Sequence, residues 1–171
     1  VDIKLEVFAA NGTLLAASDT TPNNQQLNVA LAAGTYYAVV SSHGDYSDIG
    51  PYNLAVQSLP DGWKHQDVGN VGQAGYVRFD SSTQTFSLGG SGTRIGETSD
   101  SFHFAYQQLT GDGEIITRVT SVENANESAK SGVMIRQALT NNSPHAFMLA
   151  TPTSGTWLRS RTVTAGASSD S

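Results

Sequence analysis

The stretch Ser101–Thr151, which reads SFHFAYQQL-TGDG-EIITRVTSVE-NANESAK-SGVMIRQAL-TNNSP-HAFMLAT, decides the fold class. It predicts four successive strands, each of about five or six residues or slightly more, separated by segments rich in Gly, Asn, Ser and Pro. The first join, Thr110–Gly113, ends in Asp-Gly, a dipeptide that accepts the positive φ angles of a tight hairpin turn. Four antiparallel strands cannot bury an apolar face alone, so we expect a second sheet to cover them.

The composition agrees with an all-β protein. The chain has 171 residues, which is enough for one large or two small domains. Only 14% of the residues are charged and 38% are hydrophobic, and much of the remainder is Thr, Ser, Asn, Gln and Gly, a mixture that suits exposed β surface and turns. We therefore expect two consecutive antiparallel β-sandwich units, jelly-roll-like and with almost no helix.

Several classes of protein are disfavoured. A net charge of −6 argues against nucleic acid as a partner, because phosphate binding needs clustered Lys and Arg. The absence of cysteine excludes disulfides and thiolate metal sites. No apolar run approaches the ~20 residues of a membrane span. Because the alternation of a strand begins at Val1 itself, we expect the chain to be a fragment or a mature segment of a longer precursor.

Residues 1–59 are expected to form the first unit. The alternating strand Val1–Phe8 leads into Asn11-Gly12, a tight-turn dipeptide, and its partner returns directly afterwards. The further strands predicted by alternation and by flanking turn residues are Thr13–Ala17, Leu27–Leu31, Thr35–Ser41 and Tyr52–Leu59.

This first unit resembles the bacterial pre-peptidase C-terminal domain. The residues that carry the resemblance are Leu5–Phe8 with Asn11–Ala16, then Leu31, Ala33–Tyr37, Val39 and Val40, and finally Tyr52, Leu54 and Val56. The resemblance implies a small β-sandwich appended to secreted peptidases and other exported proteins, and therefore an extracellular or cell-surface location. Members of that family carry more β-structure ahead of the position of Val1, so we expect the N-terminal part of this unit to be missing.

Pro60-Asp61-Gly62, residues 60–62, is expected to be a short linker to the second unit, residues 63–171. Besides the strands of the opening stretch, the pattern predicts strands at Gly75–Asp80, Thr85–Leu88 and Thr156–Val163. The tail Thr164–Ser171 is small and polar, which predicts a mobile end.

The second unit resembles the concanavalin A-like lectin/glucanase superfamily. The carrying residues are Asp67–Gly69, Phe86 to Gly92, Asp100 to Tyr106, Gly111–Ile115 and Lys130–Arg136. The resemblance implies a jelly-roll module of a large secreted or surface protein. Such modules continue beyond the position of Arg161 with several more strands, so we expect the C-terminal part to be missing and to be supplied by other residues or by a neighbouring chain.

The sequence offers no catalytic constellation. A zinc peptidase needs two imidazoles one helical turn apart, whereas the histidines are single and no His-Glu-x-x-His occurs; they are His43, His65, His103 and His145. A glycosidase needs two carboxylates across a cleft. The only close acid pairs of the second unit are Glu97 with Asp100 and Asp112 with Glu114, and the Glu-x-Asp-x-x-Glu spacing of the superfamily's glucanases is absent. We therefore expect a protein that is not an enzyme.

Carbohydrate binding is the alternative use of such a sandwich. Alternation places Phe102, Phe104 and Tyr106 on one face of their strand, which favours a core position, and places the polar residues on the other. The residues that could contact a polysaccharide are His103, Gln107, Arg136, Gln137 and Trp157. Two readings stay open: Arg136 could instead pair with a buried carboxylate, and Trp157 could be a sugar platform or the lid of a core.

Calcium is the one metal for which the sequence offers hard oxygen ligands. They cluster at Asp45 with Asp48, and at Glu97 with Asp100, although neither cluster matches a twelve-residue calcium loop.

The sequence thus favours a non-catalytic adhesion or carbohydrate-binding segment of a large exported bacterial protein. The main alternative is a protomer of an extracellular fibre or surface layer, in which strands of one copy complete the sheets of another. A third hypothesis is an accessory region of a secreted metallopeptidase. The expected partners are therefore a polysaccharide or other copies of the same chain.

Overall fold

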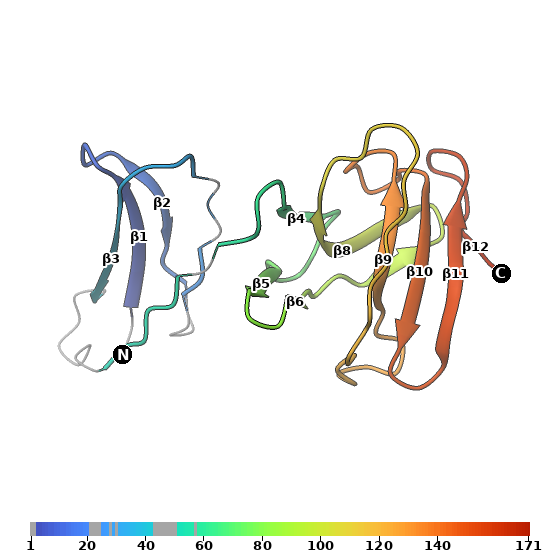
Figure 1. Ribbon diagram of the computed structural model, residues 1–171. Helices are drawn as coiled ribbons and strands as arrows, with labels where there is room; N and C mark the ends of the chain where they lie inside the picture. The colour runs from blue at the N-terminus through green and yellow to red at the C-terminus, as the bar shows by residue number, and fades with distance from the viewer. Residues whose placement is uncertain (1–2, 21–24, 28, 30, 43–50, 57) are drawn as a thin grey trace. The chain divides into compact units, whose positions relative to one another are not determined.

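The computed structural model describes residues 3–20, 25–27, 29, 31–42, 51–56 and 58–171. The chain divides into two compact units, Val1–Val56 and Gln57–Ser171. The described residues form antiparallel strands joined by turns and loops, without a helix (Figure 1). The prediction of an all-β, sandwich-like protein is therefore confirmed.

The first unit contains one antiparallel sheet in the order β2-β1-β3, formed by β1 (Ile3–Ala9), β2 (Leu14–Ser18) and β3 (Tyr36–Ser42). The predicted Asn11-Gly12 turn joins β1 to β2. Gly12 has a φ of 83°, in the left-handed region that glycine adopts at little cost. The Thr13 amide donates to the side-chain oxygen of Asn11 at 3.0 Å, as asparagine does in turns. This hairpin confirms the prediction for the start of the chain.

The rest of the first unit has less β-structure than the sequence predicts. The expected strand Tyr52–Leu59 is not formed by its described residues. The expected strand Leu27–Leu31 includes positions outside the described residues. The described part of this unit is thus a single three-stranded sheet, and the second layer of a sandwich is not seen in it.

The second unit is built from three sheets. Its strands are β4 (Lys64–Val68), β5 (Tyr76–Asp80), β6 (Thr85–Gly89), β7 (Arg94–Gly96), β8 (Ser99–Tyr106), β9 (Ser131–Arg136), β10 (His145–Thr151), β11 (Gly155–Arg161) and β12 (Ser169–Asp170). They are ordered β4-β8-β7, β12-β11-β10-β9 and β5-β6, and all are antiparallel.

The core of the second unit lies between the sheet of β8 and the sheet of β10. Figure 1 shows β9, β10 and β11 side by side, with β8 running across them. The buried residues between the two layers are Ile95, Met134, Phe147 and Leu149, and Phe102, Phe104 and Trp157 pack against them. The predicted core face of the strand that begins at Phe102 is therefore confirmed. Such crossed packing of two sheets buries one face of each.

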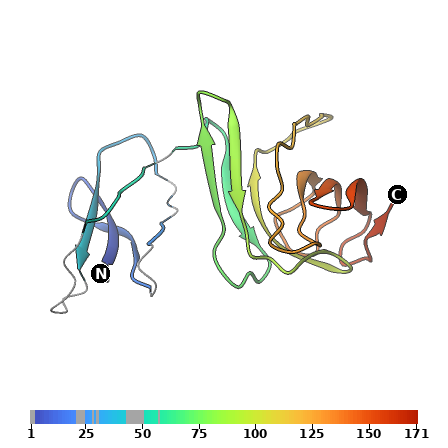
Figure 2. The ribbon, with the colours of Figure 1, turned by 90° about the horizontal axis from the view of Figure 1, so that it is seen from below.

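The β5–β6 hairpin covers the other face of β4 and β8. In Figure 2 the green hairpin lies on one side of these strands, and the orange and red strands lie on the other. Phe86 packs against Phe79 within the hairpin and against Trp63 just before β4, with ring centroids 4.7 and 4.6 Å apart. The second unit therefore has three layers, of which the middle one, β4-β8-β7, is covered on both faces.

Two predictions for the second unit are wrong. The segment Glu114–Glu123, predicted to be the second strand of the opening stretch, forms no strand, so Thr110–Gly113 is not a hairpin turn. The tail, predicted to be mobile, is instead hydrogen-bonded to the body of the unit: β12 pairs with β11, and the amide of Ser168 donates to the carbonyl of Glu97 at 2.9 Å.

Candidate functional site

The most concentrated charge in the described chain is a buried cluster around Asp100. Its carboxylate projects from β8 toward the sheet of β9, β10 and β11, and these strands supply Arg136, His145 and Arg161. The three side chains form a row across that sheet, because His145 is the register partner of both arginines. All four side chains are 0 to 2% exposed. The cluster thus connects the two layers of the sandwich through its interior.

Arg161 makes the strongest contact in this cluster. Its two terminal nitrogens donate to the two oxygens of Asp100, at 2.8 and 2.7 Å, in the bidentate geometry that suits a guanidinium and a carboxylate. Its Nε donates to the carbonyls of Glu97 and Gly166 at 3.2 and 3.0 Å, and Nη1 also reaches the carbonyl of Ser143 at 3.2 Å. The buried guanidinium is therefore both paired and hydrogen-bonded, as a buried charge must be.

Arg136 is a second cation on the same carboxylate. Its Nη1 lies 3.4 Å from Asp100 Oδ2, its Nε donates to the carbonyl of Ala138 at 2.7 Å, and its guanidinium lies over the ring of Phe102, 5.2 Å from the centroid. Burial lowers the pKa of Arg136, against the opposing effect of Asp100. Of the two readings of Arg136 that the sequence left open, the structure shows the pairing with a buried carboxylate.

His145 lies in the middle of the row. Its Nδ1 is 3.6 Å from Asp100 Oδ2, which is too long for a hydrogen bond. Burial lowers the pKa of His145, and the attraction of Asp100 opposes this less strongly. One carboxylate already faces two guanidinium groups here, so a third positive charge is unfavourable and the imidazole is held neutral.

The lowered pKa of His145 predicts a stability that depends on pH. The unfolded chain takes up a proton near the usual pKa of 6.5, whereas the folded chain does so only at lower pH. Stability is therefore fully present above about pH 6.5 and is lost as the pH falls below it, by up to about 1.4 kcal/mol per pH unit for one proton. Urea unfolding between about pH 7.5 and pH 5 measures this slope. His145→Gln should reduce the slope, and an unchanged slope would contradict the assignment.

The residues expected to contact a polysaccharide do not form a common exposed face. The side chains of His103 and Arg136 are 3% and 2% exposed, and Trp157 packs against the core. Gln107 and Gln137 are exposed, the first directly after β8 and the second directly after β9. Of the two open readings of Trp157, the structure therefore shows the lid of a core.

Of the expected calcium ligands, Glu97 and Asp100 do not form a metal site. The carboxylate of Asp100 is occupied by arginine, and the side chain of Glu97 is exposed and paired with Arg94. Asp45 and Asp48 lie outside the described residues. Among the residues that are described, no group of three or more His, Asp or Glu side chains is arranged to hold a metal ion.

A second polar group, which the sequence did not predict, joins Asp67 and His65 on β4 to His103 on β8. Asp67 Oδ1 lies 2.7 Å from His103 Nδ1, and His103 Nε2 lies 3.1 Å from His65 Nδ1. Both oxygens of Asp67 also accept the amide of Gly75, at 3.1 and 3.2 Å. The three side chains form one hydrogen-bonded chain beneath the β5–β6 hairpin. We refer to Asp67, His103 and His65 as the histidine chain.

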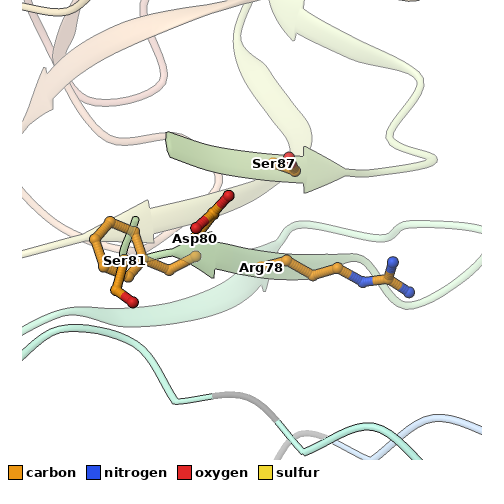
Figure 3. Close-up of a pocket in the computed structure, with 5 residues that line it drawn as sticks. Arg78, Asp80, Ser81 and Ser87 are labelled. Carbon is orange, nitrogen blue, oxygen red and sulfur yellow. The ribbon is translucent and has the colours of Figure 1, made fainter. Parts of the chain in front are cut away.

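An open hollow of about 400 Å³ lies at the β5–β6 hairpin and is lined by Arg78, Phe79, Asp80, Ser81 and Ser87 (Figure 3). Asp80 accepts hydrogen bonds from the hydroxyl and the amide of Ser82, at 2.7 and 2.8 Å, which lower its pKa. Figure 3 shows Arg78 extending away from Asp80. The hollow contains neither a histidine nor a second carboxylate, so it offers no acid–base pair.

In the described ranges, no helix has the length and apolar character needed to cross a membrane. Comparisons of the chain with protein-family models, with curated proteins and with solved structures found no match.

Proposed function

We propose that this chain is a non-catalytic contact module that associates with other copies of itself through the open β-sheet of its first unit. The proposal rests on how few residues of that unit are buried. None of its described residues is fully buried, whereas the second unit has a core of six buried hydrophobic residues. In the described part of this unit no second sheet packs on these three strands, and a sheet of this size is stable in water only when an apolar face is covered.

Three of the exposed apolar residues of the first unit lie on the same face of its sheet. Leu14, Tyr37 and Val39 are 49%, 55% and 39% exposed. Phe8 on β1 is the register partner of both Leu14 and Tyr37, and Val39 lies two residues further along β3. These four residues, which we call the apolar face, therefore cross the sheet from one edge strand to the other, beside the Lys4–Glu6 ion pair on the same face of β1. Apolar side chains grouped in this way favour association with another surface.

The strand order supports pairing between copies. In the described part of the first unit β2 and β3 are the edge strands, so each leaves one row of backbone amides and carbonyls without a neighbour in its sheet. Such edges pair readily with strands of another chain. A chain that pairs in this way would be the protomer of a fibre or surface layer, which is the main alternative from the sequence. A position outside the cell is part of the proposal, and it rests on the polar composition and the two family resemblances.

Binding to a polysaccharide is the weaker proposal. The polar residues that would make it are either buried, as His103 and Arg136 are, or not gathered at one place. The resemblance to a lectin-like sandwich supports it, whereas Trp157, its best aromatic platform, is partly buried and packs against the core.

Sedimentation of the full chain over a range of concentrations tests the proposal. We expect a mass that rises with concentration above that of the monomer. Val39→Lys places a charge on the apolar face, because Val39 is 39% exposed on an edge strand. It should weaken association at least about tenfold, equivalent to about 1.4 kcal/mol.

The matched control is Ile116→Lys, since Ile116 is 83% exposed in a loop of the second unit. This variant should associate as the unchanged chain does. A folded monomer at every concentration would overturn the proposal, and so would equal weakening by the two substitutions.

A further inference from the structure

The two edges of the sheet in the first unit differ in how well they can accept another strand. β2 has only five residues, and its register against β1 shifts between Val7 and Phe8, so that Leu15 is skipped. A bulge of this kind twists a strand and interrupts its pairing. Ser18 at the end of β2 also donates to Gln25 Oε1 at 2.7 Å, which ties the strand to the loop that follows it. Short and bulged edges resist pairing with other chains.

The other edge strand, β3, has none of these protections. Its seven residues pair with β1 in an unbroken register, and they include neither a proline nor a charged residue. In the described part of the first unit, no strand lies on its other side. Alternate residues of such an edge direct their amide and carbonyl away from the neighbouring strand, which leaves about three or four residues of β3 able to pair. β3 is therefore the edge that another chain can extend.

The geometry of an edge limits how two copies of β3 can meet. Only every second residue offers its backbone groups, so two copies of this edge that run antiparallel pair odd-numbered residues with odd and even-numbered residues with even. Side chains directly opposite one another lie on the same face of a sheet. Tyr37 and Val39 of one copy thus share a face with the same two residues of the other. The register in which all seven residues pair is centred on Val39.

This arrangement extends the apolar face without placing charges opposite one another. With Val39 at the centre, Tyr37 of each copy lies diagonally across from Val39 of the other, within reach of an aromatic side chain. The Lys4–Glu6 ion pair stays one strand further from the centre, on β1. A contact between β3 and β2 would instead set seven regular residues against five with a bulge, and fewer of them could pair.

We propose that two copies of this chain pair their β3 strands antiparallel about a two-fold axis, so that their three-stranded sheets become one continuous sheet. The inference rests on the proposed function and names the strand and the symmetry through which the copies meet. A contact of one edge with itself closes a pair. Growth into a fibre or layer then needs a second surface, for which the apolar face is available.

Disulfide cross-linking tests this symmetry, and the chain has no cysteine of its own that would interfere. Val39 and Ala17 are matched positions, because both are exposed register partners of Glu6, one on each edge of the sheet. Under mild oxidation of the full chain, Val39→Cys should form a covalent dimer, since facing Cα atoms of antiparallel strands lie about 4.5–5.5 Å apart, within the range of a disulfide. Ala17→Cys should stay without a cross-link.

The failure of this inference differs from the failure of the proposed function. A cross-link at Ala17→Cys instead, or one that forms only when the two cysteine variants are mixed, would overturn the pairing of β3 with itself but leave the association of copies standing. An unchanged chain that stays a monomer at every concentration would overturn both.

Charge exchange at the centre of the contact gives a second test that does not depend on oxidation. Val39→Lys and Val39→Glu should each weaken association at least about tenfold, because each places two like charges opposite one another. An equimolar mixture of the two variants should regain most of the lost affinity, since every mixed pair sets a lysine against a glutamate. Weakening without recovery in the mixture would overturn the two-fold pairing.

Discussion

Replacing Asp100 by asparagine is expected to lower the free energy of unfolding of the second unit by about 3–5 kcal/mol, as measured for the loss of one partner of a buried ion pair. Asp100 is 0% exposed and faces two guanidinium groups, of which that of Arg161 is also 0% exposed. Asparagine has nearly the same shape but leaves both cations without a counter-charge. Urea unfolding followed by tryptophan fluorescence measures the effect, because Trp63 and Trp157 both belong to this unit.

The matched control is Asp170→Asn. Asp170 also forms a bidentate pair, with Arg159 at 2.6 Å, but its side chain is 46% exposed. Solvent screens such a pair, so the cost should be about 1 kcal/mol or less. In addition, the double variant Asp100→Asn with Arg161→Met should lose less stability than the sum of the two single variants, since it buries one unpaired cation fewer. Equal effects of Asp100→Asn and Asp170→Asn would contradict a buried cluster that joins the two layers.

The second large effect is expected from Leu149→Ala, which should cost about 2–5 kcal/mol because it leaves a cavity in the core. Leu149 is 1% exposed on β10 and belongs to the buried group between the two sheets. The same unfolding measurement reports the loss.

The adjacent residue gives the control for that experiment. Met148 points to the opposite face of β10 and is 49% exposed. Because successive side chains of a strand point to opposite faces, Met148→Ala should change the stability by about 0.5 kcal/mol or less, as is usual at exposed positions. Similar losses from the two substitutions would show that β10 is not half-buried in a sandwich.

Most strands that the sequence predicts are formed, because alternation and turn residues act locally. The Asn11-Gly12 hairpin, the strand that starts near Phe102 and the strand His145–Thr151 are examples. The failure at Glu114–Glu123 has a physical reason. Its β-branched residues favour a strand. A strand also needs the edge of another strand to pair with, and without that partner the propensity alone does not form one. Ile116, 83% exposed, shows that this segment found neither a partner nor a core.

The two buried polar groups, around Asp100 and around His103, could not be predicted from the sequence. The sequence predicts Asp100 to be a calcium ligand, because an acid near the start of a strand gives the same pattern whether it binds a metal ion or an arginine. Only the sheet packing brings Arg161 opposite to it, from 61 residues away. Likewise, His65 and His103 are 38 residues apart, and their contact depends on the register of β4 with β8. The period-two spacing of His65 and Asp67 was the one signal that could have placed these two side chains on the same face.

The central claim, that another copy of the chain stabilises the sheet of the first unit, is tested most directly by hydrogen exchange at two protein concentrations about a hundredfold apart. The account predicts that the amides of β1, β2 and β3 exchange markedly more slowly at the higher concentration, while those of β8 and β10 are unaffected. Exchange in β1 to β3 that is already slow and independent of concentration would contradict it, because the sheet would then be stable without a partner.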